Sequence, residues 1–127
     1  MVICLSHSGL SKNKKHSEDE ILAREVIGID VIISGHTHTK MDGALKINDT
    51  IIVQAWEYGK HLGVADVAFN DGQVRLKKYR LVDIDDAIQG DAEISGQIKA
   101  FEAEINRQVL AEEDLSFREI IGETEFD

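Results

Sequence analysis

The chain has 127 residues, 43% of them hydrophobic, and its 24 acidic against 14 basic side chains give a formal net charge of −10. This length and apolar content suffice for one domain with a buried core. The negative charge argues against a surface for nucleic-acid polymers or anionic membranes, and no apolar run is long enough to span a bilayer. The start lacks the charged-then-apolar pattern of a signal peptide, and the single cysteine, Cys4, excludes an internal disulfide.

Two short apolar runs, at residues 2–5 and 31–34, predict buried strands, and each is followed by a loop that contains glycine and histidine. Between them Ser17 is expected to open a helix, with Glu20 completing a capping box and Gly28 suited to the C-terminal cap. Strand, helix and strand in this order predict a β-α-β unit with parallel strands. Because the carboxyl ends of parallel strands meet at one edge of a sheet, both histidine loops are expected there.

The histidines of these loops form the candidate site. His7 follows the first strand, and His36 and His38 follow the second. Side chains alternate in an extended segment, so His36 and His38 are expected to point to the same side with backbones about 6.5–7 Å apart. Imidazoles held in this way can bind the ions of a two-metal site, although a single histidine in a loop is more often a surface residue. The nearest acids, Asp30 and Asp42, have the character of turn residues rather than of a bridging carboxylate.

The later part of the chain predicts a strand, a hairpin and a helix. Residues 51–55 form a third apolar run, and alternating residues at 64–69 and 74–82 flank Asn70-Asp71-Gly72, a strong hairpin signal. A helix is expected over 91–113, with a narrow apolar seam that suits either a partner or the helix's own domain. The seam consists of Ile94, Ile98, Phe101, Ile105 and Val109.

Three stretches, L-S-H-S-G, I-I-S-G-H-T-H-T and I-I-V-Q-A-x-x-Y-G-K-x-L-G, resemble the later part of the calcineurin-like metallophosphoesterase domain, in its 5′-nucleotidase branch. The G-H-x-H element is common to the superfamily, and the third stretch points to the branch. The resemblance reaches to about residue 75. It implies an α/β chain with a partial metallo-dependent phosphatase fold, that is, half of a β-sandwich flanked by helices, with a β-α-β unit, a β-hairpin and a long C-terminal helix.

The resemblance also implies roles for single residues. The residues that match family metal ligands are His7 and His36 for one ion and His38 for the other, and Tyr58 and Lys60 are weak candidates for substrate binding. The family's earlier D-x-H, G-D and G-N-H-[DE] motifs do not precede these histidines in this sequence, so no catalytic residue is assigned in it. The full enzyme would use two divalent ions, zinc, manganese or iron. Three neutral imidazoles without a carboxylate do not offset the repulsion between two dications, so we expect at most one weakly bound ion here.

The function implied by the resemblance is that of a fragment of a 5′-nucleotidase-like hydrolase, which cleaves nucleotide phosphoesters through a water activated by two metals. This chain alone is expected to be inactive. The alternatives are a related 2′,3′-cyclic-nucleotide phosphodiesterase or UDP-sugar hydrolase, and a non-catalytic interaction module built on the same half-fold. An open sheet edge or the helix seam is expected to support a homodimer.

The expected organisation has three parts. Residues 1–85 are interpreted as the C-terminal half of the metallophosphoesterase domain, residues 86–118 as a linker and interdomain helix, and residues 119–127 as the start of a truncated 5′-nucleotidase C-terminal domain. Full-length relatives are often periplasmic or secreted, whereas this sequence leaves its own compartment open.

Overall fold

The computed structural model describes residues 1–125, which form two units, Met1–Asp86 and a second unit that begins at Ala87. The first unit contains a four-stranded sheet in the order β1-β2-β4-β3. Its strands are β1 (Ile3–Leu5), β2 (Val31–Ile33), β3 (Leu45–Ile47) and β4 (Thr50–Val53). β2 is parallel to both β1 and β4, while β3 is antiparallel to β4. The sequence pattern did not predict β3.

The predicted β-α-β unit is present. β1 and β2 pair in parallel, with Ile3 opposite Val31, and helix α1 (Glu18–Glu25) lies between them in the sequence. A single 3₁₀ turn, η1 (Lys14–His16), precedes the helix. Because both strands run in the same direction, the loops that follow them leave the sheet at one edge.

Helix α1 starts after Ser17, but not through the expected capping box. The Ser17 hydroxyl donates to the Glu20 carboxylate at 2.9 Å and makes no cap hydrogen bond to the backbone. Glu20 is buried and also binds Lys14 at 2.5 Å and Arg24 at 2.8 Å. Burial alone would raise the pKa of Glu20, but the hydrogen bonds from Lys14 and Ser17 and the charges of Lys14 and Arg24 outweigh it and lower this pKa. The capping-box prediction was therefore wrong, because the Glu20 carboxylate binds Lys14, Arg24 and the Ser17 hydroxyl instead of a backbone N–H at the helix start.

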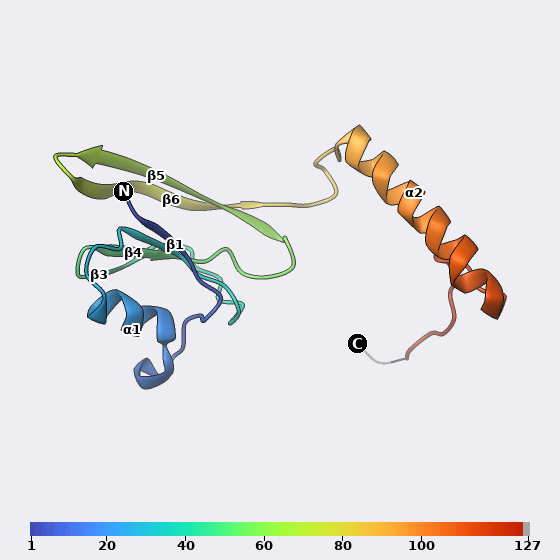
Figure 1. The fold of residues 1–127 in the computed structure, drawn as a ribbon, viewed down its shortest axis with the longest axis horizontal. Helices are drawn as coiled ribbons and strands as arrows, with labels where there is room; N and C mark the ends of the chain where they lie inside the picture. Colours follow the sequence, from blue (N-terminus) through green and yellow to red (C-terminus); the bar gives the residue numbers. More distant parts are fainter. Residues whose placement is uncertain (126–127) are drawn as a thin grey trace. The chain divides into compact units, whose positions relative to one another are not determined.

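The predicted hairpin is also present, with strands longer than the pattern indicated. β5 (His61–Asn70) and β6 (Gln73–Asp83) are antiparallel and joined by Asp71 and Gly72, which both have positive φ, as a tight two-residue turn requires. Figure 1 shows three layers in this unit, with the four-stranded sheet between α1 and the hairpin. The core follows these layers, because Ile32 packs toward the helix with Ala23 while Val31 packs toward the hairpin with Val74.

The second unit contains helix α2 (Ala92–Gln108). Asp91 caps it by accepting hydrogen bonds from the N–H groups of Glu93 and Ile94. The helix ends earlier than predicted and continues as a 3₁₀ turn, η2 (Leu110–Glu113). The segment 120–124 has no regular secondary structure, and the last two residues of the expected third part, 126–127, lie outside the described residues. Within residues 1–125, no helix is long and apolar enough to cross a membrane.

Candidate metal centre

His7 and His36 come together at the carboxyl edge of the parallel strands. Their ring centroids lie 5.1 Å apart and the rings meet edge to face, at an interplanar angle of 64°. The loops leave the sheet side by side, because the N–H of Ser6, directly after β1, donates to the carbonyl of Ile33, the last residue of β2, at 2.9 Å. Two imidazoles from separate loops are thus presented as a pair.

Two glycines allow this close approach. A Cβ at Gly35 would lie 2.9 Å from Nδ1 of His7, closer than side chains normally pack. A Cβ at Gly9 would lie 2.4 Å from the Thr37 methyl carbon, and the φ of Gly9, +92°, is one that other residues rarely adopt. Larger residues at either position would push the two histidine loops apart.

A buried carboxylate below the loops ties them together. Asp19, in the first turn of α1, is fully buried and accepts hydrogen bonds from the hydroxyls of Ser6 and Ser34, each at 2.5 Å. It also accepts from the Gly9 N–H at 3.1 Å. One carboxylate therefore fixes the ends of both β1 and β2. The sequence analysis missed this residue, although an acid in the first helical turn with a serine after each strand was the available signal.

Thr37, between the two histidines of the second loop, provides a further link. Its hydroxyl accepts a hydrogen bond from the Leu10 N–H at 3.0 Å and lies 3.5 Å from Oε1 of Gln54. Gln54 is 2% exposed, and its Nε2 has no hydrogen-bond partner in the described part of the chain. The second histidine loop is thus anchored both to the first loop and to the end of β4.

His38 has a different environment from the paired histidines. The backbone is not extended here, because φ is 67° at His36 and 49° at His38, both in the left-handed region. The alternation rule therefore does not apply, and the prediction of an extended segment was wrong. Nδ1 of His38 lies 2.9 Å from a carboxylate oxygen of Glu57, and its ring centroid lies 5.3 Å from that of Tyr58. The sequence analysis did not identify Glu57 as a neighbour of a histidine.

The two weak substrate-binding candidates lie in the same loop as Glu57. Tyr58 is 80% exposed beside His38. The Lys60 ammonium lies 3.0 Å from Glu57 and 4.5 Å from the ring centre of Trp56, so its charge is already engaged within the loop. A role of Tyr58 or Lys60 in substrate binding stays a prediction.

The donor set fits part of a metal site. The His7 and His36 rings are close enough to share one ion. Nδ1 of His38 faces the Glu57 carboxylate, and metal-binding histidines commonly have such a carboxylate partner. Among the described residues, however, no three His, Cys, Asp or Glu side chains are grouped to hold an ion. An ion at this pair would have two ligands from it and would need its other ligands from groups beyond the described residues.

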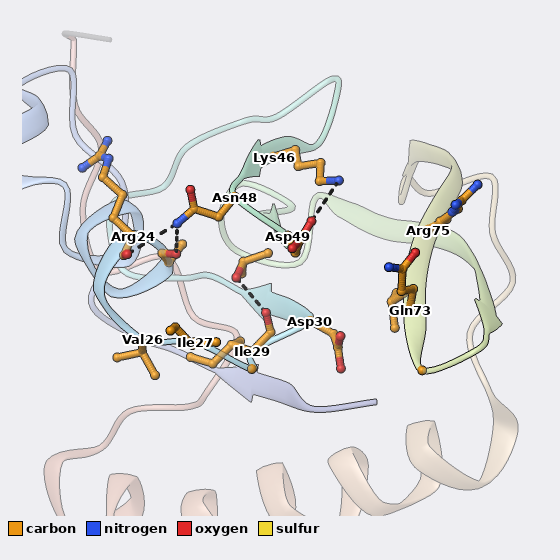
Figure 2. Close-up of a pocket in the computed structure, with 15 residues that line it drawn as sticks. Arg24, Val26, Ile27, Ile29, Asp30, Lys46, Asn48, Asp49, Gln73 and Arg75 are labelled. Atoms are coloured by element: carbon orange, nitrogen blue, oxygen red, sulfur yellow. Dashed lines mark hydrogen bonds and ion pairs between the residues drawn. The ribbon is translucent and has the colours of Figure 1, made fainter.

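A cavity of about 680 Å³ lies at the opposite edge of the sheet, near the start of β2 and β4 (Figure 2). Several of its polar groups already bind one another or the backbone. Lys46 pairs with Asp49 at 3.7 Å, Asn48 donates to the carbonyls of Ala23 and Arg24, and the Thr50 hydroxyl donates to the Ile29 carbonyl at 2.7 Å. The histidine edge is thus the better candidate site.

No family profile matches the chain, but individual proteins do. It is 39% identical over 110 residues to the trifunctional nucleotide phosphoesterase protein YfkN of Bacillus subtilis, covering 82% of this chain. It is 28% identical over 124 residues, or 83% of this chain, to the snake venom 5′-nucleotidase of Crotalus adamanteus. Among solved structures, the sulfate thiohydrolase SoxB of Thermus thermophilus aligns with 76% of this chain at a TM-score of 0.56 and 29% identity.

The chain spans only a small part of these proteins, 7% of YfkN, 20% of the Crotalus enzyme and 17% of the SoxB chain. The relatives named as nucleotidases and nucleotide phosphoesterases are hydrolases, and the α/β architecture with its sheets and two helices agrees with a partial metallophosphatase fold. The chain belongs to the calcineurin-like metallophosphoesterase superfamily, in the branch of the 5′-nucleotidases.

Proposed function

We propose that this chain supplies part of the two-metal site of an enzyme that hydrolyses nucleotide phosphoesters. The observation that carries the proposal is the His7–His36 pair at the carboxyl edge of two parallel strands, with ring centroids 5.1 Å apart. Open α/β sheets bind their ligands at this edge. Nucleotide substrates are favoured because YfkN and the Crotalus protein are named for nucleotide hydrolysis.

In this proposal His7 and His36 are ligands of one ion, and His38 is a ligand of the other. When bound, two ions polarise the phosphate and lower the pKa of a bound water. The residues of this chain hold and orient the imidazoles, through Asp19 and Thr37 for the pair and through Glu57 for His38. The carboxylates that keep two dications close, and the catalytic residues, come from outside these 127 residues.

The expected division of the chain is part of the proposal. Residues 1–85 belong to the metal-binding domain, residues 86–118 link it to the next domain, and residues 119–127 begin that domain. The histidine loops and the residues that support them all lie within the first of these parts.

A chimera tests the function directly. The matching region of YfkN is replaced by the corresponding part of this chain, and hydrolysis of a nucleotide is measured with and without added Mn²⁺. We expect activity that is lost on His36→Ala and retained on His16→Ala, a histidine on the separate turn η1. A folded chimera whose activity does not depend on His36 would contradict the proposal. The isolated chain should show no turnover of the same nucleotide.

A second candidate, a non-catalytic interaction module, is favoured by the open edge of the sheet. Within the described residues β1 pairs only with β2, and its Ile3 and Leu5 side chains are 49% and 80% exposed. An unpaired apolar edge strand promotes association, here into a homodimer. Light scattering on wild type and Leu5→Lys, taken with the chimera, separates the candidates. A dimer that Leu5→Lys dissociates, beside a folded chimera without activity, supports the module, and a monomer at all concentrations opposes it.

A further inference from the structure

The loop of residues 56–60 closes around His38. The Lys60 N–H donates to the Glu57 carbonyl at 3.0 Å, and three residues of the loop, Trp56, Tyr58 and Gly59, have positive φ values of 75°, 52° and 68°. This backbone places the Glu57 carboxylate against Nδ1 of His38 and the Tyr58 ring against the His38 ring. Two side chains of one short loop thus contact the same imidazole.

Glu57 is itself held in place. One carboxylate oxygen lies 2.9 Å from Nδ1 of His38, and the other accepts a hydrogen bond from the Lys60 ammonium at 3.0 Å. The Lys60 ammonium in turn stands over the Trp56 ring at 4.5 Å. The Glu57 side chain is 19% exposed, so water competes only weakly for its oxygens. With both oxygens engaged, the carboxylate has a fixed orientation toward the histidine.

We propose that Glu57 is a positioning residue that presents Nε2 of His38 to the metal ion. An ionised carboxylate only accepts hydrogen bonds, so the Nδ1 atom facing it must carry the proton. A neutral imidazole has one N–H, and its second nitrogen, Nε2, then carries the free lone pair that binds metal. Carboxylates behind metal-binding histidines set the tautomer in this way. The inference rests on the proposed function in naming His38 as a ligand.

The same unit contains a second histidine–carboxylate pair with the opposite polarity. Nε2 of His61 lies 3.0 Å from Asp83, and its buried Nδ1 has no hydrogen-bond partner among the described residues. By the same argument His61 carries its proton on Nε2. The two pairs therefore predict opposite tautomers in one protein, and His61–Asp83 is a matched control.

The experiment is a nitrogen NMR measurement on metal-free protein with ¹⁵N-labelled histidine at pH 8.5, about two units above the ordinary imidazole pKa of about 6.5. We expect His38 as the Nδ1–H tautomer and His61 as the Nε2–H tautomer. Glu57→Ala should shift His38 to a mixture of tautomers, while Glu57→Gln, whose amide oxygen still accepts, should restore Nδ1–H. Asp83→Asn should leave His38 unchanged, and backbone spectra confirm that each variant is folded.

The chimera with YfkN gives the second readout, because the other ligands are present in it. Glu57→Ala should raise the Mn²⁺ concentration needed for half-maximal nucleotide hydrolysis by about 10- to 100-fold, whereas Asp83→Asn should leave it unchanged. An Nε2–H tautomer at His38 in the wild type, or the same His38 tautomer in wild type and Glu57→Ala, would overturn the inference. A folded chimera that hydrolyses no nucleotide would instead refute the proposed function, and the metal-free tautomers would still decide the role of Glu57.

Discussion

The His7–His36 pair and His38 lie on the same side of the fold but are supported in different ways. The pair rests on a buried network, in which Asp19 binds hydroxyls at the ends of both parallel strands. His38 rests on a short surface loop, through a carboxylate that is itself bound to Lys60. All three histidines are exposed, but the supporting carboxylates differ, because Asp19 is fully buried and the Glu57 side chain is 19% exposed.

This difference in support indicates that the positions of His7 and His36 depend more on the folded core than the position of His38 does. Moving the paired histidines requires breaking buried hydrogen bonds, so their geometry is coupled to the stability of the β-α-β unit. Residues 56–60 belong to neither hydrophobic core cluster, so His38 can be altered separately. Variants of the first region should therefore change stability and geometry together, and variants of the second should change geometry alone.

Asp19→Ala should have the largest effect. It removes the acceptor of three hydrogen bonds at a fully buried position, and we expect the free energy of unfolding to fall by about 3 kcal/mol. The contact between the His7 and His36 rings should be lost in NMR spectra, with His38 unchanged. Asp19→Asn, which keeps one carbonyl oxygen, should lose about half as much. An unchanged ring contact in Asp19→Ala would show that the network does not position the pair.

Gly35→Ala should separate the two histidine loops. The new methyl group would lie 2.9 Å from Nδ1 of the exposed His7 ring, so the ring must leave its position, at a cost of about 0.5–1.5 kcal/mol. Gly43→Ala is the matched control, because a Cβ there has no neighbour within 4 Å, and its effect should stay within about 0.5 kcal/mol. Thermal unfolding and the His7–His36 ring contact are the measurements. Equal effects of both substitutions would contradict a requirement for glycine at Gly35.

Much of the fold could be predicted because it depends on local patterns. Apolar runs and turn residues indicated the β-α-β unit and the hairpin at Asp71-Gly72, and the histidine positions followed from the parallel strands. The left-handed backbone at His36 and His38 could not be predicted, since residues other than glycine rarely adopt it. The roles of Asp19 and Glu57 depend on polar contacts between residues 10 to 19 positions apart in the sequence, and spacing alone does not reveal such contacts.

Glu20→Gln tests the buried helix start away from both histidine regions, and its effect should be smaller, about 1 kcal/mol at neutral pH. The pKa of Glu20 is lowered in the folded protein, so its carboxylate stabilises the fold above its ordinary value of 4.5, and this contribution is lost as the pH falls through the lowered pKa. Wild type should therefore lose stability on acidification more steeply than Glu20→Gln. Parallel pH profiles in urea unfolding would contradict this assignment.

The most direct test of the central claim is a Zn²⁺ titration of the isolated chain, followed through the resonances of all five histidines. We expect His7 and His36 to respond together at the same Zn²⁺ concentration, with at most one ion held weakly, and both responses to disappear in His36→Ala. His16 and His61 should not respond in this range. Separate responses of His7 and His36, or a response of His7 that survives His36→Ala unchanged, would show that the two rings do not share an ion.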